Sequence, residues 1–202
     1  MAYSDFDLKK VKQKLGVNLI EKEHLFSSVE YFSISAYLKE TLAENIPLAR
    51  AINTEKARSE LIIANILVEL RKILEHKISL FSGVEFNVDK EKGLNGFCDF
   101  IISASTEQLM LSSPIVAVVE AKNENIIGGL GQCIAEMVAA KIFNEQENDP
   151  SVKKIYGVVT TGTTWKFLKM DGSDVYIDLD DYPIESPDKI IGILLQMVSQ
   201  KA

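Results

Sequence analysis

The chain has 202 residues, of which 47% are hydrophobic and 25% are charged, and its formal net charge is −7. This length and composition predict one globular domain, or one domain with an appendage, built around a substantial core. The acidic balance disfavours tight, sequence-independent DNA binding by the monomer, because phosphate neutralisation supplies much of that affinity. A local basic cluster could offset it: Lys9, Lys10, Lys12 and Lys14.

Cysteine usage and the absence of a targeting segment indicate the compartment. Cys98 and Cys133 lie far apart in apolar surroundings, which favours two small buried side chains over a disulfide or a zinc site. The N-terminus carries no cationic, apolar signal, and no apolar run approaches the roughly 18–20 residues needed to cross a bilayer. We therefore expect a cytoplasmic protein without membrane contact.

Helical spacing dominates the first third of the chain. Residues 5–14 are typical of a short amphipathic helix that ends near Gly16, and residues 27–48 mix helical spacing with polar side chains. The clearest helix runs from about Thr54 to Glu75 and carries a broad apolar stripe. Its later charged residues are expected at the surface: Glu69, Arg71, Lys72 and Glu75.

Strand patterns come next. Alternating apolar residues predict a strand over 78–88, and residues 89–93 are typical of a turn. Two further strands are expected over 95–105 and 114–122. The second is nearly continuous in valine and isoleucine, which indicates a strand covered on both faces.

The C-terminal part alternates between helices and strands. Gly128-Gly129-Leu130-Gly131 is interpreted as a flexible turn leading into a helix over 132–146, and a central strand follows over 154–161. A hairpin joins strands 166–170 and 175–179 through the strong turn signal Asp171-Gly172. With a last amphipathic helix over 188–201, the order predicts a mixed α/β sandwich.

Acidic and basic side chains gather on the two strands in the middle of the chain. Glu120 and Lys122 are two residues apart, so they point to the same side beyond an aliphatic run. Asp99 would lie beside them if its strand is the neighbour. Two carboxylates about 4 Å apart repel by roughly 4 kcal/mol at an effective dielectric near 20. A lysine, a proton or a cation must offset that repulsion, and the set suits a divalent metal and a phosphodiester.

With these residues, the order helix–strand–strand–strand–helix–strand resembles the PD-(D/E)XK nuclease superfamily over roughly residues 55–165. The resemblance implies a restriction-endonuclease-like mixed β-sheet flanked by helices, with the core order αβββαβ. Residues 51–202 would be the nuclease-like domain, and residues 1–50 would be an N-terminal helical extension. Cys98 stands where a proline often precedes the aspartate, and Glu136 stands where one subgroup with a Q-x-x-x-Y helix has tyrosine.

The resemblance also implies a metal site and a substrate. Asp99, Glu120 and the backbone carbonyl of Ala121 would bind Mg²⁺ or Mn²⁺, since magnesium prefers oxygen ligands and needs only one or two carboxylates. A metal-bound water becomes a better nucleophile, and the metal stabilises charge on the phosphate. The implied activity is hydrolysis of phosphodiester bonds in DNA. A homodimer is the expected assembly by analogy, because cutting both strands needs two sites.

Three further residues receive supporting roles from the same resemblance. Lys122 would orient or help deprotonate the water, or stabilise the transition state. Gln132 would position this lysine or the substrate backbone. Glu60 would complete a second metal site or hold a metal-bound water, although glutamate is common at a helix start for dipole reasons.

Other function classes stay open. A catalytically inactive nuclease-fold protein that acts as a binding module agrees with the net acidity and with the unassigned N-terminal helices. A small-molecule-binding α/β protein has less support, because no phosphate-loop motif follows the glycine run. His24 and His76 have no metal-ligand spacing and are expected to be surface or structural histidines, and Trp165 is expected to pack against the sheet.

Overall fold

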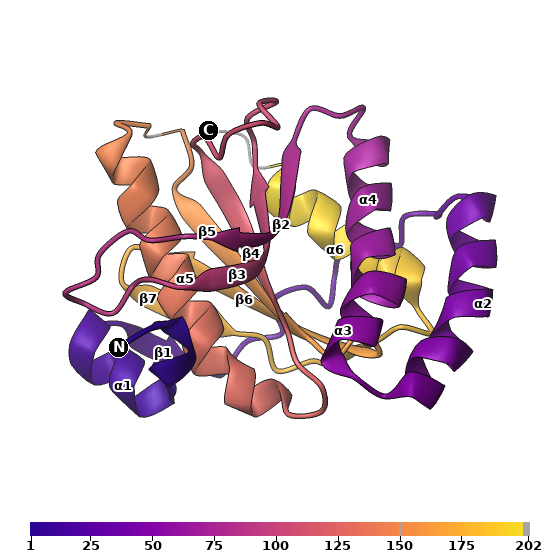
Figure 1. Cartoon of the computed structure of the whole chain (residues 1–202), viewed down its shortest axis with the longest axis horizontal. Helices are drawn as coiled ribbons and strands as arrows, with labels where there is room; N and C mark the ends of the chain where they lie inside the picture. The colour runs from indigo at the N-terminus through magenta and orange to yellow at the C-terminus, as the bar shows by residue number, and fades with distance from the viewer. Residues whose placement is uncertain (150, 200–202) are drawn as a thin grey trace.

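The computed structural model describes residues 1–149 and 151–199. In these residues a mixed eight-stranded sheet forms the middle layer, with helices on both faces (Figure 1). The strands follow the order β1-β7-β6-β5-β4-β3-β2, and β8 pairs with β6. This arrangement confirms the predicted mixed α/β architecture.

From residue 54 onward the helices and strands occur in the predicted order. The strands are β1 (Asn18–Ile20), β2 (Ser79–Glu85), β3 (Phe97–Ser103), β4 (Ile115–Ala121), β5 (Lys154–Thr160), β6 (Thr164–Asp171), β7 (Asp174–Ile177) and β8 (Tyr182–Pro183). The helices are α1 (Leu8–Leu15), α2 (Ala36–Ile52), α3 (Glu55–Arg58), α4 (Ala64–Ile73), α5 (Ile126–Gln146) and α6 (Pro187–Val198). Two short segments complete the list: the 3₁₀ turn η1 (Tyr3–Asp5) and the π-helical turn η2 (Ser59–Ile63).

The centre of the sheet is formed by β3, β4 and β5. β3 runs antiparallel to β4, with Phe100 opposite Val119, and β4 runs parallel to β5 through the crossover helix α5. Every residue of β4 is buried, as its valine and isoleucine content predicts. The sheet therefore has a covered strand at its middle, and polar groups at the end of that strand lose contact with water.

Two apolar cores cover the two faces of the sheet. One includes Ile62, Leu67 and Ile193 from the helices η2, α4 and α6, together with Leu38 of α2. The other includes Val11 of α1 and the inner face of α5. The predicted helix over 54–75 is present as α3, η2 and α4 in succession, and it ends at Ile73.

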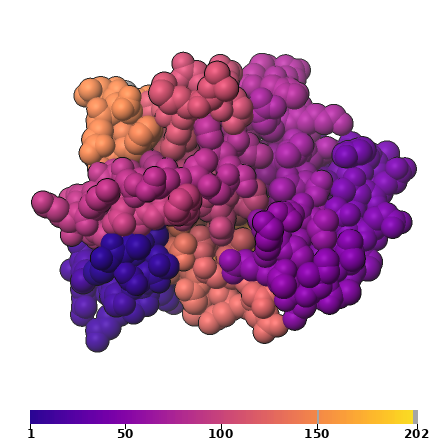
Figure 2. All heavy atoms as spheres, viewed as in Figure 1, coloured from indigo at the N-terminus to yellow at the C-terminus, as the bar shows by residue number. Residues whose placement is uncertain are grey.

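Residues 1–52 contribute to both cores and are not solely helical. Residues 18–20 form a strand that was not predicted, and this strand pairs in parallel with β7. The helix expected over 27–48 begins only at Ala36, because the Ser35 hydroxyl accepts the backbone N–H of Leu38 and caps it. The first residues lie against α5 and the 86–96 segment, where the Tyr3 hydroxyl donates to the Phe86 carbonyl at 2.8 Å (Figure 2).

The expectation that Glu69 lies at the surface was wrong. Its side chain is buried, and its Oε1 accepts the backbone N–H of Ser35 at 2.8 Å. A buried carboxylate is tolerated when such donors replace its water. The pairing joins α4 to the start of α2, a contact between distant segments that helical periodicity does not reveal.

The glycine run 128–131 was interpreted as a turn, but it lies inside α5. The helix begins at Ile126, and the Asn125 side chain caps it by accepting the N–H of Gly128 at 2.8 Å. A Cβ at Gly131 would lie 2.5 Å from the Phe6 carbonyl oxygen. The glycine is therefore required for close packing of the N-terminal segment on α5, and its conformational freedom plays no part.

One described helix, α5, is long and apolar enough to cross a bilayer, which the sequence reading had excluded for every segment. In the structure 56% of its apolar window is buried. Its inner face packs on the sheet, as expected for the core helix of a soluble protein.

Four further predictions are confirmed in the described residues. The hairpin of β6 and β7 is present, Trp165 is buried, and both cysteines are free and buried. His24 and His76 are exposed. The last helix runs over Pro187–Val198, while positions 200 and 201 of its predicted range lie outside the described residues.

Replacing Gly131 by alanine tests the packing of the N-terminal segment on α5. The new Cβ would meet backbone atoms of Asp7 and Phe6, so Gly131→Ala should lower the free energy of unfolding by about 1–3 kcal/mol in urea titrations. Gly128→Ala is the comparison on the same helix, because its Cβ would meet the capping side chain of Asn125 and no backbone atom, so its cost should not exceed the loss of one cap, about 1 kcal/mol. Equal effects of the two changes would contradict the packing argument.

Candidate active site

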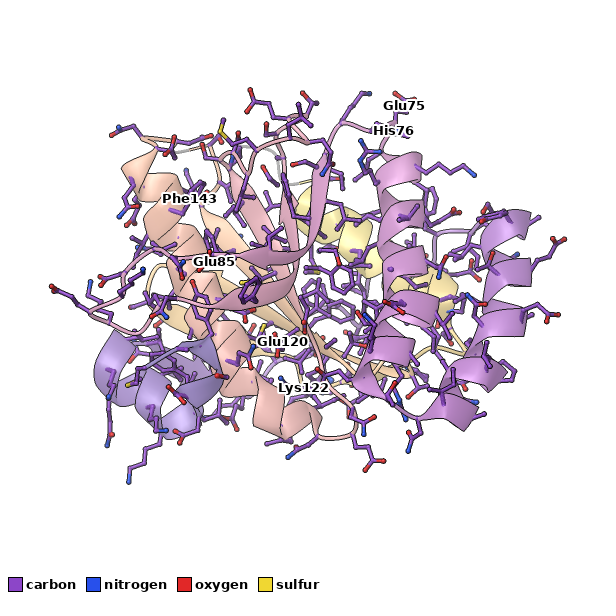
Figure 3. All side chains as sticks on the ribbon, in the orientation of Figure 1. Glu75, His76, Glu85, Glu120, Lys122 and Phe143 are labelled. Carbon is purple, nitrogen blue, oxygen red and sulfur yellow. The ribbon has the colours of Figure 1, made fainter. Side chains whose placement is uncertain are left out.

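Asp99, Glu120 and Lys122 meet where β3 and β4 end. The register of the two strands brings Asp99 next to the end of β4, and its Oδ2 accepts the backbone N–H of Ala121 at 2.8 Å. Figure 3 shows Glu120 and Lys122 near the end of β4, between α5 and α3. The expected neighbourhood of the two carboxylates and the lysine is therefore present.

Lys122 holds the cluster together. Its Nζ donates to Glu120 Oε1 in an ion pair and to Gln132 Oε1 at 3.2 Å. Its backbone N–H continues the β4–β5 pairing by donating to the Thr160 carbonyl at 2.8 Å. A Cβ at Gly129 would lie 3.0 Å from Lys122 Cγ, so this helical glycine leaves the space that the lysine stem occupies.

Glu136 is a member of the cluster that the sequence reading did not assign. It is fully buried, and Gln132 Nε2 donates to its Oε1 at 3.1 Å. Gln132 and Glu136 are four residues apart on α5 and so lie on one face, which is the signal that could have found it. The site thus contains three carboxyl groups where two were expected.

Burial raises the pKa of all three carboxyl groups. The pKa of Glu120 is raised to about 7, because burial and the Asp99 charge raise it more than Lys122 and Glu136 lower it. The pKa of Asp99 is raised by burial, and the Ala121 N–H and Lys122 act against this shift. Glu136 has a pKa well above its usual range because of burial and the neighbouring Glu120, which favours its protonated form.

Lys122 keeps its proton in this surrounding. Burial lowers the pKa of Lys122, but the contacting Glu120 raises it more, and the net pKa lies above 10.5. The thiols of Cys98 and Cys133 also stay protonated, since burial and the nearby Glu136 raise their pKa. The cysteines therefore act as buried apolar side chains.

Glu60 stands apart from the three carboxyl groups. It lies in η2 on the rim of a pocket of about 270 Å³ that Asp99 and Ala121 also line. Its Oε1 pairs with Lys56 Nζ at 3.0 Å, and its side chain is 62% exposed. The structure brings together four of the predicted site residues (Asp99, Glu120, Lys122 and Gln132) and leaves Glu60 at the edge of the open pocket.

The donor set fits a hard divalent cation. Glu120 Oε2 and Glu136 Oε2 are both buried without a geometrically complete hydrogen bond in the described residues, and a proton shared with Glu136 lowers the pKa of Glu120. Asp99 lines an open pocket. Those residues contain no group of three or more His, Cys, Asp or Glu side chains placed to hold a metal. Mg²⁺ needs only one or two carboxylates and keeps several waters, so the pair with the Ala121 carbonyl is sufficient.

No protein-family model matches this chain, and comparison with curated proteins gives no match. The chemistry of the site therefore follows from its own residues. These are two carboxylates at the ends of neighbouring strands, a protonated lysine between them and α5, and a buried acid behind them.

The raised pKa of Glu120 predicts a stability that falls with pH. Between its unfolded pKa of 4.5 and its folded pKa of about 7, the folded state binds more protons, so the free energy of unfolding decreases as pH rises through this window. Glu120→Gln removes this dependence. Relative to wild type, the variant should gain about 2–3 kcal/mol between pH 4.5 and pH 7.5 in urea titrations.

The exposed Glu145, which pairs with Lys141 at the far end of α5, supplies the control. Glu145→Gln should track the wild-type pH profile. Parallel profiles for wild type and Glu120→Gln would show that the carboxyl group is ionised at the same pH in both states.

Proposed function

We propose that this chain is a restriction-endonuclease-like domain that hydrolyses phosphodiester bonds in DNA with Mg²⁺ or Mn²⁺, in the cytoplasm. The observation that carries the proposal is the cluster of Asp99, Glu120 and Lys122 at the ends of β3 and β4, beside an open pocket. The element order from α3 to β5 supports the same assignment.

Asp99 Oδ, Glu120 Oε2 and the Ala121 carbonyl are the groups that would hold the ion. When bound, the ion lowers the pKa of a coordinated water and stabilises negative charge on the phosphate. The Ala121 N–H orients the Asp99 carboxylate. Glu60 lies on the rim of the same pocket, where it would contact a water or the substrate and would not be a direct ligand of the ion.

The protonation state of Lys122 favours one of its expected roles. A lysine with a raised pKa cannot accept a proton at neutral pH, so Lys122 stabilises charge on the phosphate as a donor and does not act as the base. Gln132 orients the ammonium group, and the hydrogen bond to Glu136 fixes the amide of Gln132. Two hydrogen bonds in series thus hold the lysine at the end of β4.

Cleavage assays on plasmid and single-stranded DNA test the proposal. Asp99→Asn, Glu120→Gln and Lys122→Ala should each lower the rate of Mg²⁺-dependent cleavage by about 10²–10³-fold or more, because each removes a group that stabilises the transition state. Glu145→Gln, an exposed change at the far end of α5, should leave the rate unchanged.

Circular dichroism of each variant separates loss of activity from loss of fold. Cleavage by all three folded variants at the wild-type rate would contradict the proposed mechanism. Absence of cleavage by wild type on every DNA form would remove the activity.

Metal affinity should depend on pH. Because burial raises the pKa of Glu120 to about 7, a cation must displace a proton below this pH. In calorimetric titrations, Mg²⁺ or Mn²⁺ affinity should increase by about tenfold per pH unit below pH 7 and level off above it. Glu120→Gln should abolish binding. A wild-type affinity that does not vary with pH would exclude Glu120 as a ligand.

A second function is favoured by one contact. The Lys122 ammonium already pairs with Glu120 and compensates its charge without any cation, as a structural ion pair would. This pairing is what we expect in a catalytically inactive nuclease-fold protein that binds a partner. The metal titration separates the two functions, because no binding by wild type would place the partner-binding function first.

A further inference from the structure

A second polar pocket, of about 470 Å³, lies beside the carboxylate cluster. Its walls come from the end of α3, the loop that joins β4 to α5, and the turn between β5 and β6. Ala121 lines the carboxylate pocket, Asn123 lines this second pocket, and Lys122 stands between them in the chain. The second pocket therefore begins one residue after Lys122 in the chain.

Arg58 gives the second pocket its charge. Its Nη1 donates to the Thr161 carbonyl at 3.1 Å and to the Thr163 hydroxyl at 3.5 Å, and its Nη2 donates to Asn53 Oδ1 at 2.7 Å. All of these acceptors are neutral. The Arg58 Nε–H is buried and has no hydrogen-bond partner in the described residues, so an anion in the pocket would meet the Nη side of the guanidinium.

The two other arginines of the chain are engaged differently. Arg50 pairs with the Glu185 carboxylate at 2.7 Å, and Arg71 contacts His76 at 2.8 Å. Arg58 and Arg71 both lack a carboxylate partner in the described part of the chain, and Arg58 is the one of the two that lines this pocket, where its contacts fix the guanidinium plane without neutralising it. A guanidinium held in this way loses little side-chain entropy when it binds an anion, and its planar fork suits phosphate oxygens.

The other walls add neutral donors and one opposing charge. The Thr161 and Thr163 hydroxyls lie 3.0 Å apart at the β5–β6 turn. The first turn of the 21-residue helix α5 lines the same pocket, and its N-terminal amides favour negative charge. Glu124 is also on the wall, but its side chain is exposed to solvent.

We infer that this pocket binds a phosphate group of the nucleic-acid backbone, next to the phosphodiester placed at Asp99 and Lys122, with Arg58 as the principal donor. The inference rests on the proposed function, since it names where the substrate backbone is held. It also explains how a chain with a net charge of −7 can present positive charge to DNA, because the charge is local and positioned.

Fluorescence anisotropy with a labelled duplex and a labelled single strand tests the inference. The titrations use the whole chain in EDTA, so that the measurement depends on neither metal nor cleavage. Arg58→Gln should weaken binding about tenfold, as expected for the loss of one charge-assisted hydrogen bond, and should lower the slope of log affinity against log salt by about 1. Arg50→Gln is the matched control and should leave both quantities unchanged.

Glu124→Gln supplies a second test that does not depend on the structural contacts of Arg58. Removing this exposed carboxylate from the pocket wall should tighten DNA binding severalfold. The inference is overturned if folded Arg58→Gln and Glu124→Gln both bind like wild type. It is also overturned if inorganic phosphate binds through Arg58 while neither form of DNA binds.

The same experiments separate this inference from the nuclease proposal. Arg58-dependent DNA binding without cleavage by wild type would overturn the nuclease activity alone. Mg²⁺-dependent cleavage combined with binding that ignores Arg58 and Glu124 would overturn the phosphate pocket alone.

Discussion

The burial of the Glu120 carboxyl group is the constraint on which the site depends. β4 is covered on both faces, so a carboxyl group at its end loses water and must be compensated by neighbouring groups. Lys122 provides a charge, and Gln132 and Glu136 extend the hydrogen bonding into α5. The same burial raises the pKa of Glu120 and couples its protonation to that of Glu136.

The close approach of α5 to the sheet and to the N-terminal segment places these groups. Gly129 leaves room for the Lys122 stem, and Gly131 allows the Phe6–Asp7 backbone to press against the helix. Residues at the start of the chain thus brace the helix that carries Gln132 and Glu136. At the other side of Lys122, α3 contributes to both pockets. One pocket carries Asp99 and Glu60, and the other carries Arg58.

Local patterning was sufficient for most of the fold. Alternation and aliphatic runs predicted the strands from β2 to β7, and helical spacing predicted the helix from 54 to 75. Patterning failed where a distant contact decides the structure. The three residues of β1 are a strand because β7 lies beside them, Glu69 is buried because Ser35 reaches it, and the glycine run is helical because Phe6 packs on it.

The sequence by itself determined which chemical groups stand at the ends of β3 and β4, since the two-residue spacing of Glu120 and Lys122 and the alternation around Asp99 are local. It also determined Gln132 on the following helix. Only the tertiary structure decided that Glu136 joins these groups, that Glu60 stays at the rim, and that Arg58 meets the β5–β6 turn. The physical reason is the distance along the chain over which each effect acts. Local periodicity determines which face of a helix or strand a side chain occupies. Burial is determined by the distant segment that packs against that face, and burial in turn sets the pKa and the charge compensation of the side chain.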